Sequence, residues 1–336
     1  MAAERQSAAA PGAAGTLPSA TRPLPLRADT WLLAVDGSRG ADNAARYVAH
    51  TAKALGVGVI RVVNARLPAV GAERTSVARQ RADAMADARR TTASAQRILG
   101  FAGLSFRLEA PVGDDPAALI VGASEDADVT EVVMGTRGVS MLSSVTLGSV
   151  AYKVLHMARR SVTLVPDRAR VAGRGGRRSP LAMLLAVDGS SAANRAVQYA
   201  ARQAAANSAA RVLLLNVQPR IVSQNVRRFV SSVQIEMYAQ QEAAAAMRAA
   251  ERILGKAGVR YERRVSRGDV VETILETAAE SDCGRIVLGT RGRGAAKSLL
   301  LGSVAYGVVH HADMPVTVVK QALPAPVLLP RSSARR

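Results

Sequence analysis

Short apolar runs rich in β-branched residues alternate along this chain with longer, alanine-rich amphipathic stretches. The short runs predict strands and the longer stretches predict helices, because these are the lengths and residue types typical of each. In the first half of the chain the predicted strands are Leu32–Val35, Val59–Val63, Phe106–Glu109, Glu131–Met134 and Val162–Val165. The predicted helices between them include Ala41–Leu55, Arg79–Leu99 and Pro116–Ala123. Strands that alternate with helices predict an α/β fold with a parallel sheet covered on both faces.

The whole pattern occurs a second time, and the two copies align with few gaps. Both copies contain "LLAVDGS", and "AQRILGFAG" aligns with "AERILGKAG", at an offset of 152 to 155 residues. The predicted strands of the second copy are Met183–Val187, Arg211–Val217, Tyr261–Val265, Arg285–Leu288 and Val316–Val319. We therefore predict two domains, a basic Gly/Arg-rich linker and two disordered tails. The domains are residues 29–167 and 180–321, the linker is 168–179, and the tails are 1–28 and 322–336.

Each copy carries the spacing G-x2-G-x9-G-S directly after its fourth predicted strand. These residues are Gly135, Gly138, Gly148 and Ser149 in the first copy, and Gly289, Gly292, Gly302 and Ser303 in the second. Glycines that admit close approach, followed by a serine that caps a helix, are what a backbone needs to hold phosphate groups. The carboxyl edge of a parallel sheet is also where ligands of such folds bind. We favour phosphate binding over the alternative of ordinary turn glycines and an ordinary helix cap.

An aspartate follows the first strand of each copy, Asp36 and Asp188, and so lies at the same edge. Its carboxylate can accept hydrogen bonds from ribose hydroxyls or approach a phosphate-bound Mg²⁺. The alternative is an Asx-turn or N-cap formed by the sequence Asp-Gly-Ser, and we favour the ligand role. Arg137 and Arg291 lie in the two "GTRG" turns. They either pair with phosphate oxygens or lie in solvent, and the sequence does not decide between these two.

Composition and charge narrow the classes of function. The single cysteine, Cys283, cannot form an internal disulfide, and we find no secretion signal and no apolar run of membrane-spanning length, so we expect a cytoplasmic protein. The net charge of +19 suggests nucleic-acid binding, but 10 of the excess positive charges fall in the predicted tails and linker. We therefore do not expect specific nucleic-acid binding.

Motifs of catalysis are absent from the sequence. No serine, histidine and acidic grouping recurs at catalytic spacing, and no cysteine–histidine cluster indicates a protein-bound metal. A Walker A sequence and a G-x-G-x-x-G turn after a first strand are also missing. We predict no catalytic residue and no metal held by protein ligands alone.

"AVDGS", "VVMGTRG", the glycine spacing and the closing "PVTVV" resemble the universal stress protein family, over residues 29–167 and 180–321. The resemblance implies two Rossmann-like, flavodoxin-like domains, each with five parallel strands in the order 3-2-1-4-5. It implies ATP as the ligand, often with Mg²⁺, with the aspartates facing ribose or metal and the glycines and serines holding phosphates. Adenine would contact the backbone near Val63 and Leu215. Family members dimerise through their last strands, so Val162–Val165 and Val316–Val319 are expected to pair within one chain as a pseudo-dimer.

The expected function is that of a nucleotide-responsive stress protein rather than an enzyme, with at most slow ATP hydrolysis. Without a general base or a charged clamp in the first loop, efficient phosphoryl transfer is not expected. A downstream protein partner and a further homodimer are left open. The alternatives are an adenylating enzyme of a related α/β class, a scaffold whose sites stay empty, and a polyanion-binding protein that uses the basic linker.

The two copies differ in the charge around their glycines, which predicts two sites of unequal affinity. Residues 139–147 contain no cation, whereas the second loop contains Arg293 and Lys297. Since positive charge holds a triphosphate more firmly, we expect the second site to bind ATP more tightly. The nucleotide affinities of the two separated domains would test this. Equal affinities, or a tighter first domain, would reject the idea.

Overall fold

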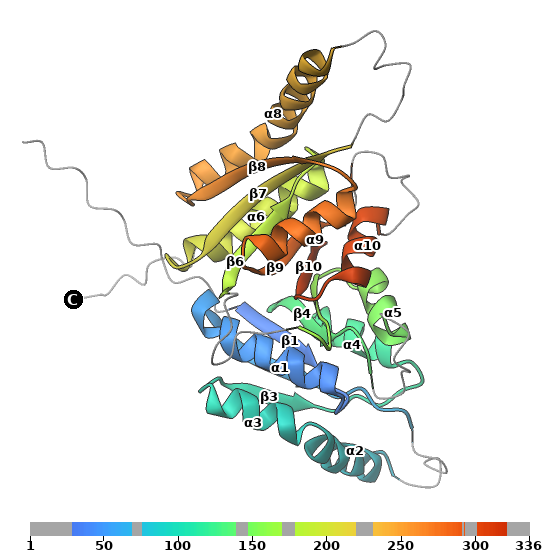
Figure 1. The fold of residues 1–336 in the computed structure, drawn as a ribbon. Helices are drawn as coiled ribbons and strands as arrows, with labels where there is room; N and C mark the ends of the chain where they lie inside the picture. The colour runs from blue at the N-terminus through green and yellow to red at the C-terminus, as the bar shows by residue number, and fades with distance from the viewer. Residues whose placement is uncertain are drawn as a thin grey trace, which may run out of the picture. The chain divides into compact units, whose positions relative to one another are not determined.

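The computed structural model describes residues 29–68, 76–138, 147–169, 179–219, 231–290, 292 and 301–320. Their central feature is one ten-stranded sheet with helices on both faces (Figure 1). The order of the strands is β3-β2-β1-β4-β5-β10-β9-β6-β7-β8. The first five strands come from the first repeat and the other five from the second.

Each repeat contributes five mutually parallel strands in the order 3-2-1-4-5. In the first repeat they are β1 (Asp29–Ala34), β2 (Val57–Val63), β3 (Phe106–Glu109), β4 (Val129–Gly135) and β5 (Ser161–Val165). In the second they are β6 (Ser179–Ala186), β7 (Arg211–Gln218), β8 (Tyr261–Arg267), β9 (Cys283–Gly289) and β10 (Val316–Val319). This confirms the predicted strands and their order. The bounds of β3 and β10 are as predicted, and those of the others differ by a few residues.

The two repeats join through their last strands. β5 and β10 pair antiparallel, with Val162 opposite Val318 and Thr163 opposite Thr317. The predicted pairing within one chain is therefore confirmed. Since each strand covers the edge of the other, neither leaves a row of unpaired backbone groups at this position.

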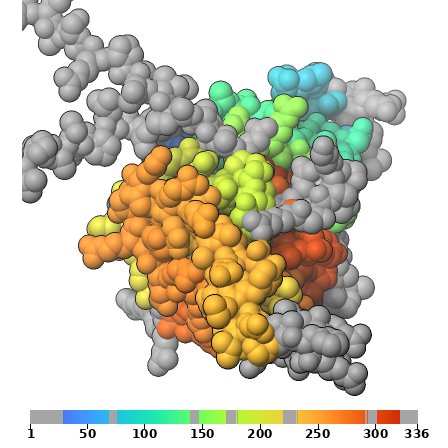
Figure 2. All heavy atoms as spheres, turned by 90° about the horizontal axis from the view of Figure 1, so that it is seen from above, coloured from blue at the N-terminus to red at the C-terminus, as the bar shows by residue number. Residues whose placement is uncertain are grey.

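Helices of both repeats pack against the sheet. In the first repeat they are α1 (Arg39–Thr51), η1 (Lys53–Leu55), α2 (Val77–Thr91), α3 (Ala93–Phe101), α4 (Pro116–Ser124) and α5 (Ser149–Met157). In the second they are α6 (Ser191–Ala205), α8 (Ser232–Lys256), α9 (Val270–Glu280) and α10 (Ser303–His311). Figure 2 shows α8 and β8, in gold and orange, at the surface beside the outer edge of the second repeat.

On one face, a single apolar cluster runs across both repeats beneath α4, α5, α9 and α10. This shared cluster includes Leu32, Val132 and Val162 from the first repeat and Leu184, Ile286 and Val318 from the second. On the other face the apolar residues form two separate clusters. One lies beneath α1 and α3 and the other beneath α6 and α8.

The predicted helix Arg79–Leu99 is two helices, α2 and α3, which meet at Thr92. The Thr92 hydroxyl donates to the carbonyl of Ala88 at 2.7 Å, and the residue has φ −95° and ψ 5°. A side chain that bonds back to the preceding turn competes with the regular helix, which accounts for the break. At the corresponding position the second repeat has Met247, and α8 continues through it as one helix of 25 residues.

The predicted domain boundaries stay predictions, because the described residues of both repeats belong to one compact unit, Ala28–Ala325. The predicted tails and residues 170–178 of the predicted linker lie outside the described residues. Among the helices that are described, none is both long enough and apolar enough to cross a membrane.

The shared cluster and the continuous sheet predict that the two repeats unfold together. Trp31 is the only tryptophan of the chain and is buried in the first repeat, so its fluorescence reports that repeat alone. Far-UV circular dichroism reports the helices of both repeats. We expect the two signals to change at the same urea concentration. A fluorescence transition displaced from the dichroism transition would show that the repeats unfold separately.

Candidate functional site

A cavity of about 260 Å³ opens at the carboxyl ends of β1 and β4. All seven residues predicted for the first site line it: Asp36, Val63, Gly135, Arg137, Gly138, Gly148 and Ser149. They come from the ends of three strands, the turn after β4 and the start of α5. The structure therefore brings them together, while their binding role stays a prediction.

The lining of the cavity includes both apolar side chains and polar backbone groups. Val63, Ala65, Pro116 and Ile120 form an apolar wall between the ends of the strands and α4. The lining also includes the glycine backbone of the turn after β4 and the first turn of α5. Such a cavity fits a ligand with a flat apolar part and a polar or anionic part.

Asp36 lies in the turn between β1 and α1. Its Oδ1 accepts a hydrogen bond from the backbone N–H of Ser38 at 3.0 Å, and the Ser38 hydroxyl caps α1 by accepting from Ala41 N–H at 3.1 Å. Gly37 between them has φ +83°, a conformation that favours glycine. The Asx-turn that we treated as the alternative is therefore present. It engages Oδ1 in one hydrogen bond, and the ligand role of the carboxylate stays a prediction.

Gly138 faces the other carboxylate oxygen of Asp36. A Cβ at position 138 would lie 2.6 Å from Asp36 Oδ2, which is shorter than any normal contact. A side chain at position 138 would displace the carboxylate of Asp36, and glycine leaves room for it.

Gly135 ends β4 and lies against the first turn of α1. A Cβ at Gly135 would lie 2.7 Å from the carbonyl carbon of Gly40 and 3.0 Å from its Cα. We predicted that Gly135 admits a ribose or phosphate. The structure adds a second reason for a glycine, because the space that its Cβ would take holds the backbone of α1; the approach of a ligand stays a prediction.

The predicted N-cap Ser149 is wrong by one residue, because the cap of α5 is Gly148. Gly148 has extended backbone angles, φ −72° and ψ 155°, and Ser149 is the first helical residue. The Gly148 N–H donates to the Thr136 carbonyl at 2.7 Å, which fixes the turn. No side chain of the described residues caps the start of α5.

This glycine cap distinguishes α5 and α10 from the other helices that follow a loop. Side chains of Ser38, Ser76, Asp115, Ser190, Ser231 and Asp269 cap α1, α2, α4, α6, α8 and α9, respectively. The first N–H groups of a helix carry partial positive charge and attract anions. The two helices that follow the glycine motif are thus left with donors for a ligand.

Arg137 is held in place by Asp167. Its Nη1 lies 3.7 Å from Asp167 Oδ2, and its side chain is 19% exposed, so the alternative of a solvated arginine is wrong. Its buried Nε has no hydrogen-bond partner among the described residues. The guanidinium lines the cavity and keeps donor capacity, but its pairing with phosphate is untested.

Asn64, which follows Val63, was not among the predicted site residues. The Asn64 side-chain amide donates to the carbonyl of Val35 at 2.6 Å, while the Val35 N–H donates to the Val63 carbonyl at 2.9 Å. These bonds fix the end of β1, and with it Asp36, relative to β2. The second repeat has the same amide contact, from Asn216 to Val187 at 2.7 Å. The alignment of the two copies contained this signal, since the same asparagine occurs at the end of both second strands.

The described residues of the second site repeat this geometry. Asp188 Oδ1 accepts from Ser190 N–H at 2.9 Å, and a Cβ at Gly292 would lie 2.7 Å from Asp188 Oδ2. A Cβ at Gly289 would lie 2.5 Å from the backbone of Ala192. The carbonyl of Leu215 accepts from Val187 N–H at 2.9 Å.

The start of α10 matches that of α5. Gly302 is the N-cap, without a side-chain cap, and its N–H donates to the Thr290 carbonyl at 2.7 Å. Ser303 is again the first helical residue rather than the predicted cap. Arg291, together with Arg293 and Lys297, lies outside the described residues, so the predicted difference in charge stays a prediction.

The fold and the site match one known protein family. The model of the universal stress protein family matches residues 29–166 and 182–320, one match for each repeat. The chain belongs to the universal stress protein family.

Two curated relatives are also universal stress proteins. One, from Mycolicibacterium smegmatis, is 30% identical over 210 residues, which are 61% of this chain and 65% of the relative, slightly under two thirds of its length. Another, from Thermus aquaticus, is 32% identical over 139 residues, which are 41% of this chain and 97% of the relative. The second match corresponds to a single repeat in length.

Solved structures agree on the fold. A universal stress protein from Archaeoglobus fulgidus has a TM-score of 0.62 and 22% identity, and the alignment covers 88% of this chain and 99% of that one. One from Pseudomonas aeruginosa has a TM-score of 0.56 and 15% identity, with 87% and 93% covered. At these identities the likeness shows that the tandem α/β fold is shared.

The contact between β4 and α1 predicts that Gly135→Ala destabilises the protein. The added Cβ would meet backbone atoms of Gly40 that cannot rotate away, so we expect a loss of about 1–3 kcal/mol in unfolding free energy, measured by urea denaturation. Gly122→Ala on α4 is the matched control, since nothing lies within 4 Å of its Cβ position. We expect that change to have no effect or to stabilise by up to about 1 kcal/mol. Equal effects of the two substitutions would contradict the packing role.

Proposed function

We propose that this protein is a nucleotide-dependent regulator of a stress response that binds ATP, with Mg²⁺, at the carboxyl edge of each repeat. The observation that supports it best is the start of α5, which no side chain of the described residues caps and which lines a cavity that also has apolar side chains. Adenine, ribose and phosphate would match the apolar wall, Asp36 and the start of α5 in that order. The proposal applies equally to the matching residues of the second repeat.

Each part of ATP has a physical reason to lie where this proposal puts it. The adenine ring gains from the apolar side chains around Val63, and the edge of the ring can hydrogen-bond to the backbone at the end of β2. The phosphates would accept hydrogen bonds from the N–H groups at the start of α5 and from the hydroxyl of Ser149. With these donors the ligand supplies the cap that the sequence of α5 lacks.

Mg²⁺ would bind between the phosphates and a carboxylate oxygen of Asp36 or Asp188. Magnesium prefers oxygen ligands and commonly takes one or two carboxylates together with substrate phosphates. No cluster of three acidic, histidine or cysteine side chains that would hold a metal occurs among the described residues. The phosphates would therefore supply part of the coordination.

The lining of the first cavity favours binding over fast catalysis. Arg137 is the one cation among the described lining residues, and it already pairs with Asp167. Apart from Asp36, which this proposal assigns to ribose or Mg²⁺, those lining residues include no acidic side chain, histidine or lysine to act as a general base or to neutralise the charge that develops on the phosphates. We propose at most slow hydrolysis, and we place the adenylating enzyme second.

Asp36→Asn is the sharpest test of the proposed site. Asparagine keeps Oδ1 for the Asx-turn with Ser38 and so preserves the loop, but it removes the negative charge. We expect about a tenfold weaker affinity for Mg-ATP at the first site, measured by calorimetric titration, with a smaller loss when Mg²⁺ is omitted. Asp188→Asn should act in the same way on the second site.

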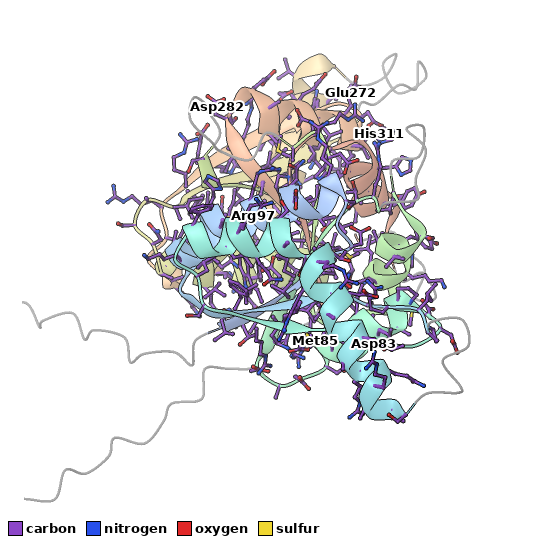
Figure 3. All side chains as sticks on the ribbon, turned by 90° about the horizontal axis from the view of Figure 1, so that it is seen from below. Asp83, Met85, Arg97, Glu272, Asp282 and His311 are labelled. Atoms are coloured by element: carbon purple, nitrogen blue, oxygen red, sulfur yellow. The ribbon has the colours of Figure 1, made fainter. Side chains whose placement is uncertain are left out.

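Asp83→Asn is the matched control. Asp83 is an exposed carboxylate on α2 (Figure 3) and is not among the residues that line the cavity. We expect that variant to bind like the unmodified protein. Native mass spectrometry of freshly purified protein should show two adenine nucleotides per chain. If no nucleotide binds at millimolar ATP, the sites are those of a scaffold and the proposal is wrong.

A further inference from the structure

The joint between the repeats has one apolar face and one charged face. On the first, the shared cluster crosses β5 and β10 without a polar interruption. On the other, buried polar side chains lie between the two separate apolar clusters, where α1 of one repeat approaches α6 of the other. They include one acidic and one basic residue, Glu131 and Arg285, each fully buried.

Glu131 on β4 is hydrogen-bonded to side chains of β5 and α6. Its Oε1 accepts from the Thr163 hydroxyl at 2.5 Å, and its Oε2 accepts from the Tyr199 hydroxyl at 2.5 Å. Thr163 lies 2.6 Å from the hydroxyl of Thr317. Because the one proton of Thr163 goes to Glu131, Thr317 is the donor in that pair. Tyr199 and Thr317 belong to the second repeat, so Glu131 is bound across the joint both directly and through Thr163.

Arg285 on β9 is bonded across the joint in the opposite direction. Its Nη1 donates to the hydroxyl of Tyr47 on α1 at 3.1 Å, and its Nη2 donates to Gln203 on α6. Gln203 in turn donates to Tyr199 at 2.7 Å. A chain of hydrogen bonds therefore leads from the guanidinium to the carboxylate.

Glu131 and Arg285 occupy the same position in the two repeats. Each lies four residues before the glycine that ends its strand, Gly135 or Gly289. Their tyrosine partners are equivalent as well, since Tyr47 and Tyr199 each lie eleven residues after Asp36 or Asp188. The backbone and the two tyrosines at the joint are therefore related by an approximate twofold axis. The equivalent residues Glu131 and Arg285 break this symmetry, because their charges are opposite.

The opposite charges of Glu131 and Arg285 affect which repeats can pair through their last strands. Two first repeats joined in the same way would bury two carboxylates at the joint, and two second repeats would bury two guanidinium groups. Buried like charges repel strongly, and a buried charge that loses its opposite partner is strongly destabilising. The apolar face and the threonine pair offer no such discrimination, because they are alike in both repeats.

We propose that Glu131 and Arg285 act as a pairing code that makes the last-strand surface of each repeat accept an unlike repeat and reject a like one. The partner of the first repeat is a repeat with a basic residue at the position of Arg285, which the same chain supplies. Copies of this chain do not join through like repeats. The inference is independent of nucleotide binding.

Charge reversals in the full chain test the code. Glu131→Arg and Arg285→Glu each place like charges at the joint, and we expect each to lower the urea midpoint by roughly 1 M. The double exchange, E131R/R285E, restores opposite charges and keeps both tyrosines, so it should recover at least half of that loss. Full recovery is not expected, since Trp31 and Thr51 of the first repeat stand where the second has Met183 and Gln203. A double exchange no more stable than the single variants would overturn the proposal.

Neutral substitutions test the same coupling if the charge-reversal variants do not fold. Glu131→Gln and Arg285→Gln each leave one buried charge without its opposite. Their combination should cost less than the sum of the two single losses. Additive losses would mean that the two groups do not sense each other, and would overturn the code.

Co-purification of variant chains distinguishes a role in partner selection from a role in stability alone. E131R and R285E chains with different tags are co-expressed, and one tag is purified. We expect the other chain to be recovered with it, because each E131R first repeat matches an R285E second repeat, and one such joint suffices for capture. Two tagged E131R chains should not capture each other, since every combination joins two arginines.

The control for general instability is Arg61→Glu. The buried Arg61 pairs with the more exposed Glu109 and Asp126 inside the first repeat, so its reversal disturbs the ion pairs of a buried arginine without changing the joint. Co-expressed with R285E, it should give less capture than E131R does, because Arg285 of the R61E chain already has Glu131 as its opposite charge within the same chain. Capture with R61E equal to that with E131R, or no capture of E131R by R285E, would overturn the proposal.

Discussion

Thr163 and Thr317 lie opposite each other where β5 and β10 pair antiparallel, and their hydroxyl groups are hydrogen-bonded at 2.6 Å. Much of the rest of the structure depends on the pairing of these two strands. It covers two apolar strand edges at once, extends the shared cluster through both repeats, and brings α1 of one repeat to α6 of the other. A first repeat without this partner would expose the backbone of Val162 and Leu164 at an open edge, the situation that native sheets avoid.

The glycines of the repeated motif serve two different purposes. Gly135 is required by packing, because backbone of α1 occupies the space of its side chain, whereas a side chain at Gly138 would displace the carboxylate of Asp36. Gly148 differs, since it leaves the first donors of α5 without a side-chain cap although serine or aspartate caps most other helices. A bound anion is therefore indicated by Gly148 and its counterpart Gly302 more than by the rest of the motif.

Much of the fold was predictable because each strand is a compact apolar run. Val316–Val319 and Phe106–Glu109 have the predicted bounds, and the pairing of the last strands followed from the family resemblance. The break at Thr92 was not predictable from periodicity, since it depends on one hydroxyl bonding back to Ala88. The site residues were found because parallel strands end at a common edge. The contacts that hold them, such as Asn64 to Val35 and Arg137 to Asp167, join residues distant in sequence and leave no trace in local spacing.

The antiparallel joint also sets the direction in which each repeat faces. Strands within a repeat are parallel, so reversing direction between β5 and β10 places the carboxyl edges of the two repeats on opposite margins of the sheet. Asp36 and Asp188 consequently lie at opposite margins as well. A molecule that covers one of these margins therefore leaves the other accessible, so the two ends of the sheet are open to independent contacts.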